Sequence, residues 1–361
     1  MIVRPLTEYC TLNMGQSPDS KTYNTQGKGL PFYQGNADFG ETHPITHVWC
    51  SAPVKVAEDG DILISVRAPI GAMNMAVERC CIGRGLAALT PIRNKCSKQF
   101  LYYALQSKVD SLIAQGTGST FKAISKKVLE ATCIPAYSTI EQEQIAETIG
   151  HVDNTIAARR KQLALLDQLV KSRFIELFGD PMTDVSKWSA STIGEQFNVS
   201  SGGTPATGEK AYWENGTIPW IGSNMCQDTM LSENDGKFIT EEGYAHSSAK
   251  WFHKGTVLVA LVGATIGKTA LLRFDTTTNQ NIAAIDVTQN AAFSSEFVFY
   301  HMQMLYSKFM EIGSGKFKMA NQGFIRQLPL ICPPIELQEQ FATFVEQTDK
   351  SKLCGRMEVA A

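Results

Sequence analysis

This 361-residue sequence has no run of about 18 apolar residues, the length that a membrane-spanning helix requires. Residues 1–11 contain Arg4, Pro5 and Glu8, and they lack the apolar core of a secretory signal peptide. The sequence therefore shows no sign of a helical membrane protein or of a secreted one. We therefore predict a cytoplasmic protein that makes no use of a membrane.

Cysteine pairs with C-x-x-C spacing are also absent. The nine cysteines are odd in number and irregularly spaced, which fits neither a disulfide framework nor a zinc site. His43, His47 and Cys50 have a ligand-like spacing, but Pro44 opposes a single helical face and no Glu adjoins either histidine. We predict buried free thiols and loop histidines, and no metal.

The sequence has little excess charge of either sign, with 33 Lys and Arg against 35 Asp and Glu. Residues 1–139 carry 14 basic and 10 acidic side chains, whereas residues 186–334 carry 11 and 12. A strongly basic balance, the usual mark of a nucleic-acid binder, is therefore missing. A domain without net charge still binds DNA when its Lys and Arg gather on one face. The charge balance therefore does not exclude a DNA-binding protein.

Complete catalytic and nucleotide-binding motifs are missing as well. Segment 263–269 resembles a phosphate-binding loop, but three residues separate its glycines where the motif requires four. Segment 83–88 has the glycines of a dinucleotide site, yet it precedes a predicted strand instead of a helix. Segment 332–335 lacks the outer residues of the adenine-methyltransferase motif Asn-Pro-Pro-Tyr. We therefore predict a binding protein and no enzyme.

What the sequence does contain is an internal repeat with a period of about 196 residues. Five pairs of segments match in the same order along the chain. The pairs are 60–71 with 255–267, 85–89 with 281–285, 100–103 with 297–300, 115–122 with 312–318, and 141–145 with 337–341. Five collinear matches indicate duplication. A repeat of this kind is interpreted before any local motif, because it sets the architecture of the whole chain.

Each half shows the same order of predicted elements. A polar opening (residues 15–18 and 201–205) precedes a β-branched apolar run, which predicts a buried strand, and a second short strand follows. Next come a helix, a Gly-rich loop with lysines, a Pro-containing turn and a last helix. The predicted strands are 61–66 and 85–89 in the first half and 256–262 and 282–287 in the second; the predicted helices are 99–114 and 295–312.

The last helix of the first half has apolar residues at a spacing near 3.5, which predicts a coiled coil over residues 140–178, about 58 Å long. An ordinary amphipathic helix on a core is the alternative. The helix is predicted to end at 179–181, where Gly is followed by Asp and Pro. The predicted seam residues are Ile145, Ile149, Val152, Ile156, Leu163, Leu166 and Val170.

The second copy of this helix restarts at Phe341 and Val345, fades near Lys352 and is predicted to break at Gly355. The fold class that we predict is α+β, with two tandem, internally duplicated domains separated by a long helix. A shortened second helix lies at the C-terminus. The predicted domains are 1–139 and 181–334, with helical regions 140–180 and 335–361.

These segments resemble a known family. Residues 15–21, 29–35, 60–67 and 82–88 look like the first domain of type I restriction–modification specificity subunits. Residues 201–205, 218–221, 333–340 and 177–181 resemble the second domain and the connecting regions. The resemblance covers almost the entire chain in the same order. The short second helix departs from the family, whose members generally end in a helix that matches the first. An alternative is therefore that two chains pair through their long helices, instead of the two helices of one chain pairing with each other.

The resemblance implies a specificity subunit without catalysis. Each domain would be a target-recognition domain that reads one half of a split, asymmetric site in double-stranded DNA. The shortened C-terminal helix would pack antiparallel on the long helix as a coiled coil. The helices would set the distance between the half-sites and dock two modification subunits, which bind S-adenosylmethionine and methylate adenine; a restriction subunit that translocates and cleaves DNA would join them. No cofactor is expected in this chain. Alternatives are a methylation-only system, a coiled-coil protein-binding scaffold with duplicated domains and, third, an enzyme.

Candidate DNA contacts are polar and basic residues of the loops, because base edges are read by Arg, Lys, Asn and Gln, and phosphates are bound by Lys and Arg. In the first half they are Gln16, Ser17, Lys21, Asn24, Gln34, Arg67, Arg84 and Lys122. In the second half they are Thr204, Lys210, Asn224, Lys268, Gln280, Lys316, Lys318, Asn321 and Gln322.

Lys122 and Lys318 are the best matched of these candidates, since each follows a repeated Gly-rich loop and an aromatic residue. We predict that Lys318→Ala weakens DNA binding to a similar degree on all sequences. The salt slope of binding should fall by about one, as expected for one lost phosphate contact. A titration at several salt concentrations measures it, and an unchanged slope would count against the contact.

Overall fold

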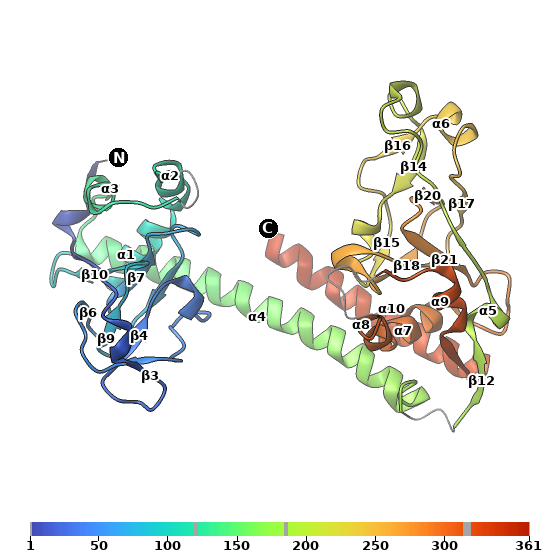
Figure 1. Cartoon of the computed structure of the whole chain (residues 1–361), viewed down its shortest axis with the longest axis horizontal. Helices are drawn as coiled ribbons and strands as arrows, with labels where there is room; N and C mark the ends of the chain where they lie inside the picture. The colour runs from blue at the N-terminus through green and yellow to red at the C-terminus, as the bar shows by residue number, and fades with distance from the viewer. Residues whose placement is uncertain (1, 119–121, 184–186, 313–318, 361) are drawn as a thin grey trace. The chain divides into compact units, whose positions relative to one another are not determined.

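The computed structural model describes residues 2–118, 122–183, 187–312 and 319–360, with side chains up to Lys352 (Figure 1). The chain forms two compact units, residues 1–157 and residues 158–361. Helix α4 (Thr139–Phe178) begins in the first unit and ends in the second. Each unit is described by itself below.

The first unit has two small sheets over a helical layer. One sheet has the strand order β2 (Cys10–Met14), β10 (Leu86–Pro91), β7 (Ile62–Ser65) and β8 (Met73–Met75). The other has the order β3 (Tyr23–Asn24), β5 (Trp49–Cys50), β4 (Leu30–Tyr33), β9 (Cys80–Ile82) and β6 (Val56–Ala57). Strand β1 (Val3–Pro5) pairs with β11 (Cys133–Pro135), and the helices are α1 (Lys98–Gln106), α2 (Val109–Ala114) and α3 (Lys126–Ala131).

The second unit repeats this arrangement. Its larger sheet has the order β13 (Asn198–Ser201), β21 (Ile282–Asp286), β18 (Val257–Ala260), β19 (Thr269–Leu272) and β15 (Thr229–Leu231). Its smaller sheet has the order β16 (Phe238–Ile239), β14 (Ile218–Ile221), β20 (Thr276–Thr278) and β17 (Trp251–Phe252), and β12 (Ser189–Thr192) pairs with β22 (Pro329–Cys332). The helices are α5 (Ile193–Gln196), α6 (Glu241–Ala245), α7 (Ser295–Met304), α8 (Tyr306–Met310), α9 (Gln322–Gln327) and α10 (Ile335–Ala360).

The strand pairings confirm the duplication. In each unit one parallel pair lies inside a small sheet: β4 runs parallel to β9 with Phe32 opposite Cys81, and β14 runs parallel to β20 with Trp220 opposite Thr277. The strand that precedes each polar opening, β2 or β13, pairs antiparallel with β10 or β21, respectively. The predicted α+β class with two duplicated halves is therefore correct.

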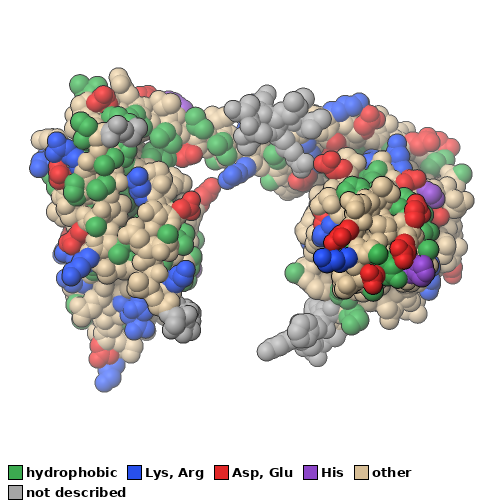
Figure 2. Space-filling view, turned by 90° about the horizontal axis from the view of Figure 1, so that it is seen from above, with side chains coloured by type: hydrophobic (Ala, Val, Ile, Leu, Met, Phe, Trp, Pro, Cys, Tyr) green, Lys and Arg blue, Asp and Glu red, His purple; other side chains and the backbone are tan. Residues whose placement is uncertain are grey.

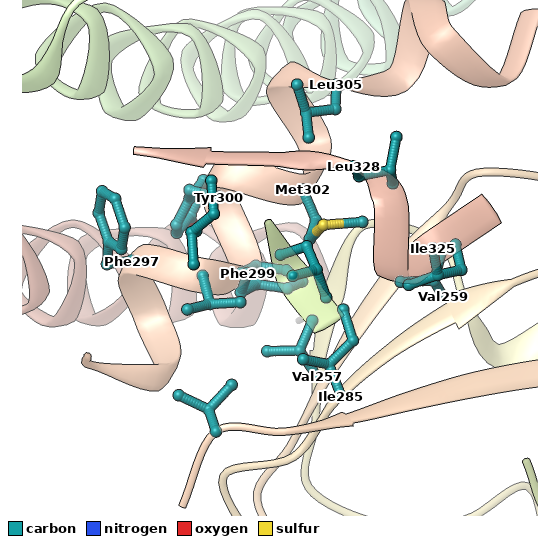
Figure 3. Close-up of a cluster of buried hydrophobic side chains, with 14 of the residues drawn as sticks. Val257, Val259, Ile285, Phe297, Phe299, Tyr300, Met302, Leu305, Ile325 and Leu328 are labelled. Atoms are coloured by element: carbon teal, nitrogen blue, oxygen red, sulfur yellow. The ribbon is translucent and has the colours of Figure 1, made fainter. Parts of the chain in front are cut away.

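The central strands are apolar throughout because both of their faces are buried. In β18, Val257 and Val259 face the helices, while Leu258 and Ala260 face the smaller sheet. Figure 3 shows Val257 beside Ile285 and near Phe299 of α7, and Val259 beside Ile325 of α9. Strand β7 of the first unit alternates in the same way between two clusters. A strand that is buried on both faces loses the alternation of polar and apolar residues, which explains the unbroken runs in the sequence.

The two long helices contact each other in antiparallel directions. The ring centroids of Phe174 in α4 and Phe341 in α10 lie 5.5 Å apart, and Lys352 of α10 forms an ion pair of 2.8 Å with Asp167 of α4. The break predicted at Gly355 is wrong, since α10 continues to Ala360. A glycine inside a helix costs only about 1 kcal/mol relative to alanine, which its helix-forming neighbours offset.

The predicted seam is buried only in part. Val170, Phe341 and Val345 lie in the core of the second unit, and Ile145 packs against the core of the first, whereas Val152 is 54% exposed. The others are half-buried: Ile149, Ile156, Leu163 and Leu166. The sequence interpretation missed Phe174 and Phe178, which are fully buried. They follow Val170 at a spacing of four, so the end of α4 packs on a globular core as well as on α10.

In the described part of the chain the cysteines are free, and most of them are buried, as predicted; burial raises the pKa of the Cys10 thiol to about 12. Among the described residues, no group of three or more His, Cys, Asp or Glu side chains is arranged to hold a metal ion. None of the described helices combines the length and apolar character that crossing a membrane requires.

Candidate nucleic-acid interface

The polar opening of the first unit crosses the end of the parallel pair β4–β9. The Gln16 amide donates to the Ile82 carbonyl at 3.0 Å, and the Ser17 hydroxyl donates to Oε1 of Gln34 at 3.0 Å. The same hydroxyl oxygen accepts a hydrogen bond from the Arg84 amide at 3.2 Å. Three segments that are distant in the sequence therefore meet at one place.

The end of β7 and residues 122–123 lie beside these three segments. The Val66 amide donates to the Gly85 carbonyl at 2.9 Å, which brings the end of β7 beside Arg84. Arg67 lies opposite Ala123 in an antiparallel bridge, so Lys122 is next to it. We call Gln16, Ser17, Gln34, Arg67, Arg84 and Lys122 the first edge. All but the half-buried Ser17 are exposed, and none of its basic side chains forms an ion pair with a described residue.

The second unit rebuilds the same place with matching backbone hydrogen bonds. The Gly203 amide donates to Thr278, Leu261 to Asn281 and Ala320 to Leu261, at 2.8, 2.9 and 2.9 Å. The Thr204 hydroxyl donates to Oε1 of Gln280 at 2.6 Å. We call Thr204, Val262, Gln280 and Met319 the second edge; Val262 lies opposite Met319 as Arg67 lies opposite Ala123.

A glycine is required where each opening crosses the strands. A Cβ atom at Gly15 would collide with the Gly83 carbonyl oxygen, and one at Gly202 would collide with that of Thr278. The lack of a side chain lets the opening approach the sheet backbone closely. This close approach explains the glycine in both copies and holds Ser17 and Thr204 in equivalent positions.

Several predicted contact residues have other partners in the structure. The Asn24 carboxamide bonds the backbone of Lys28 and Trp49 and so holds its own loop. Asn321 accepts from the Phe324 amide and caps helix α9, as short polar side chains do at helix N-termini. The Gln322 carboxamide donates to the Ser201 hydroxyl at 3.0 Å. These three side chains stabilise the local fold.

Lys268 and Lys210 are paired with acids. The Lys268 ammonium lies 2.5 Å from Asp228 and 5.1 Å from the centre of the Tyr306 ring. The Lys268 ammonium is therefore already paired with a carboxylate before any phosphate approaches it. Lys210 lies 3.5 Å from Glu214 on an exposed turn. Lys21 and Asn224 are on short exposed or half-exposed turns next to the openings, and Lys316 and Lys318 lie outside the described residues.

The sequence interpretation missed a pair of equivalent buried glutamines. The Oε1 atom of Gln142 accepts from the Ser97 amide at 2.9 Å, and its Nε2 donates to the Lys95 and Tyr137 carbonyls at 3.1 and 3.0 Å. Gln338 makes the same three bonds to Ser294, Ala292 and Pro333, at 2.9, 3.0 and 2.9 Å. Both side chains are 0% exposed. The match between segments 141–145 and 337–341 was the sequence signal from which this pair of glutamines could have been found.

Comparison with known proteins gives a consistent result. The family model described as type I restriction modification DNA specificity domain matches residues 1–168 and 185–354. A Methanocaldococcus jannaschii protein described as a specificity subunit of the type I restriction enzyme MjaX is 41% identical over 164 residues, 45% of this chain and 39% of that protein. The MjaIX specificity subunit of the same organism is 24% identical over 301 residues, covering 75% of this chain and 69% of that one.

A solved type I restriction–modification S subunit from M. genitalium has a TM-score of 0.60 at 17% identity, and the match covers 99% of this chain and 92% of that one. This likeness shows that the fold is shared. The match to the MjaX relative spans less than half of that protein's length.

The fold and the two edges define a duplicated α+β binding protein in which one scaffold presents different polar side chains twice. The family model covers nearly all of the sequence, in both halves. The chain belongs to the family of type I restriction–modification DNA specificity domains.

Proposed function

We propose that this chain is the sequence-recognition subunit of a type I restriction–modification complex. The first and second edges each contact one half of a bipartite site in double-stranded DNA. Residues 1–139 and 181–334 are the two readers, and 140–180 with 335–361 form the spacer that sets their separation. Two modification subunits dock on the spacer, bind S-adenosylmethionine and methylate adenine in the cytoplasm, and a restriction subunit completes the complex.

One observation supports this proposal most directly. The same backbone hydrogen bonds build both edges, whereas the side chains that they present differ: Arg84 in the first corresponds to Gln280 in the second. A constant scaffold with variable exposed side chains is what two readers of different half-sites require, because base edges are distinguished by the donors and acceptors that face them.

Methylation-aware sequencing of the host genome, with and without this chain, tests the proposal. The expected result is one split, asymmetric motif whose adenines lose methylation when the chain is removed and regain it when the gene is restored. An unchanged methylome, together with nonspecific binding to randomised duplexes in the presence of the modification subunit, would instead favour a protein-binding scaffold.

A further inference from the structure

Each edge holds one glutamine carboxamide on a hydroxyl group. In the first edge the Ser17 hydroxyl donates to Oε1 of Gln34 at 3.0 Å, and in the second the Thr204 hydroxyl donates to Oε1 of Gln280 at 2.6 Å. Both glutamines are exposed, and both hydroxyl residues are half-buried. A carboxamide that faces solvent is thus held by a hydroxyl group that belongs to the body of its unit.

The backbone around each hydroxyl residue is restricted before any partner binds. Ser17 precedes the buried Pro18, and Thr204 precedes the buried Pro205. The residue before a proline is restricted to extended backbone, and the proline ring allows only a narrow range of φ. Together with the glycine that lets each opening cross the strands, this restriction gives the two hydroxyl groups fixed and equivalent positions.

The two glutamines come from different segments of the repeat. Gln34 follows β4, whereas Gln280 follows β20, the strand that is equivalent to β9. The residue of the first unit that is equivalent to Gln280 is Arg84. Duplication alone therefore accounts for the equivalent hydroxyl groups, but it does not account for the two carboxamides. A pair that arises twice from different positions is expected where the exposed carboxamide itself has a role.

A carboxamide distinguishes bases without carrying charge. Its Nε2 amino group is a donor and its Oε1 atom is an acceptor, and together they match N7 and N6 of adenine in the major groove. Rotation of the carboxamide by half a turn exchanges donor and acceptor, so a freely rotating glutamine distinguishes bases less well. The Thr204 hydroxyl bonds Oε1 of Gln280, which fixes the side on which Nε2 lies and leaves one lone pair of Oε1 free.

We propose that Gln34 and Gln280 each read one adenine–thymine base pair, in the half-site that faces their own edge. Ser17 and Thr204 are the positioning residues that set the orientation of the two carboxamides. This inference rests on the proposed function and adds residues that determine specificity. Figure 2 shows that uncharged polar side chains and backbone, drawn in tan, make up much of the visible surface between scattered Lys and Arg. Because the hydroxyl group already orders the carboxamide, binding loses less side-chain entropy.

Single substitutions test the reading role of the two glutamines. Methylation by the complex with its modification subunits is measured on duplexes in which each base pair of the motif is replaced in turn. Gln280→Ala is expected to reduce discrimination at one base pair by about 5- to 150-fold. Gln34→Ala is expected to do the same at one base pair of the other half-site. Neither variant should change the salt slope of binding, since a carboxamide releases no counterions.

Thr204→Val tests positioning, because it removes the hydroxyl group at nearly constant volume and leaves Gln280 in place. Discrimination at the base pair that Gln280 reads should fall by about 2- to 13-fold, since the carboxamide must then be ordered on binding. Thr204→Ser keeps the hydroxyl group and should restore discrimination. Thr207→Val is the matched control, because Thr207 is exposed three residues further along the same loop, and it should leave base preference unchanged.

The inference is overturned if Gln280→Ala leaves base preference unchanged, or if Gln34→Ala relaxes the same half-site as Gln280→Ala. Relaxation at a base pair other than adenine–thymine would also contradict it. If Thr204→Val behaves like Thr207→Val, or if Thr204→Ser fails to restore discrimination, the hydroxyl group does not position the carboxamide. The absence of any specific motif with the unaltered complex would be a different failure, that of the proposed function itself. Equal melting temperatures of all variants show that each one folds.

Discussion

Replacement of Phe341 by alanine is expected to lower the free energy of unfolding of the second unit by about 3–5 kcal/mol. Phe341 is fully buried, and its ring centroid lies 5.5 Å from that of Phe174, 5.6 Å from Phe178 and 5.4 Å from Tyr300. Removal of the ring leaves a cavity between α10, the end of α4 and helix α7, which close packing cannot refill. Urea-induced unfolding followed by tryptophan fluorescence measures the loss.

The control for this prediction is Phe344→Ala on the same helix, whose ring is half-buried and lies 6.0 Å from the Arg173 guanidinium. Its cost should be clearly smaller than that of Phe341→Ala. Because Phe341 joins α10 to α4, Phe341→Ala should also weaken assembly with modification subunits if they dock on the helical spacer. Equal destabilisation by the two variants would show that the aromatic cluster is not the point at which α10 is held.

Replacement of Gln142 by alanine is expected to cost the first unit about 2–4 kcal/mol. The change leaves the Ser97 amide and the Lys95 and Tyr137 carbonyls without their partner, in a place where the carboxamide is 0% exposed. A buried donor or acceptor that loses its hydrogen bond costs about 1–3 kcal/mol. Urea unfolding measures the total, and hydrogen exchange at the Ser97 amide reports the specific bond, which should lose protection.

Gln144→Ala is the control for this variant, since Gln144 is exposed one half-turn further along α4. It should change stability by less than about 0.5 kcal/mol, as surface substitutions generally do. Gln338→Ala and its exposed neighbour Gln340→Ala repeat the comparison in the second unit. A cost at Gln142 as small as that at Gln144 would mean that water replaces the carboxamide without penalty.

The duplication, the order of elements and the buried strands were readable from the sequence. Apolar runs such as Ile62–Ser65 and Val257–Ala260 gain stability wherever both faces can be covered, so their composition alone identified central strands. The long helix followed from its spacing and from the Gly-Asp-Pro stop after Phe178. These features depend on neighbours within a few residues, and the sequence contains that information directly.

The tertiary structure alone decided which polar side chains have partners within the chain and which do not. Lys268 and Arg84 look alike as exposed loop cations in the sequence, yet Lys268 faces Asp228, forty residues away, while Arg84 has no described acidic partner. The same holds for the buried Gln142 and the exposed Gln144, which differ only in which way the helix turns them. Hydrogen bonds and ion pairs of this kind join segments that approach only after the sheets have formed, and local spacing carries no record of that approach.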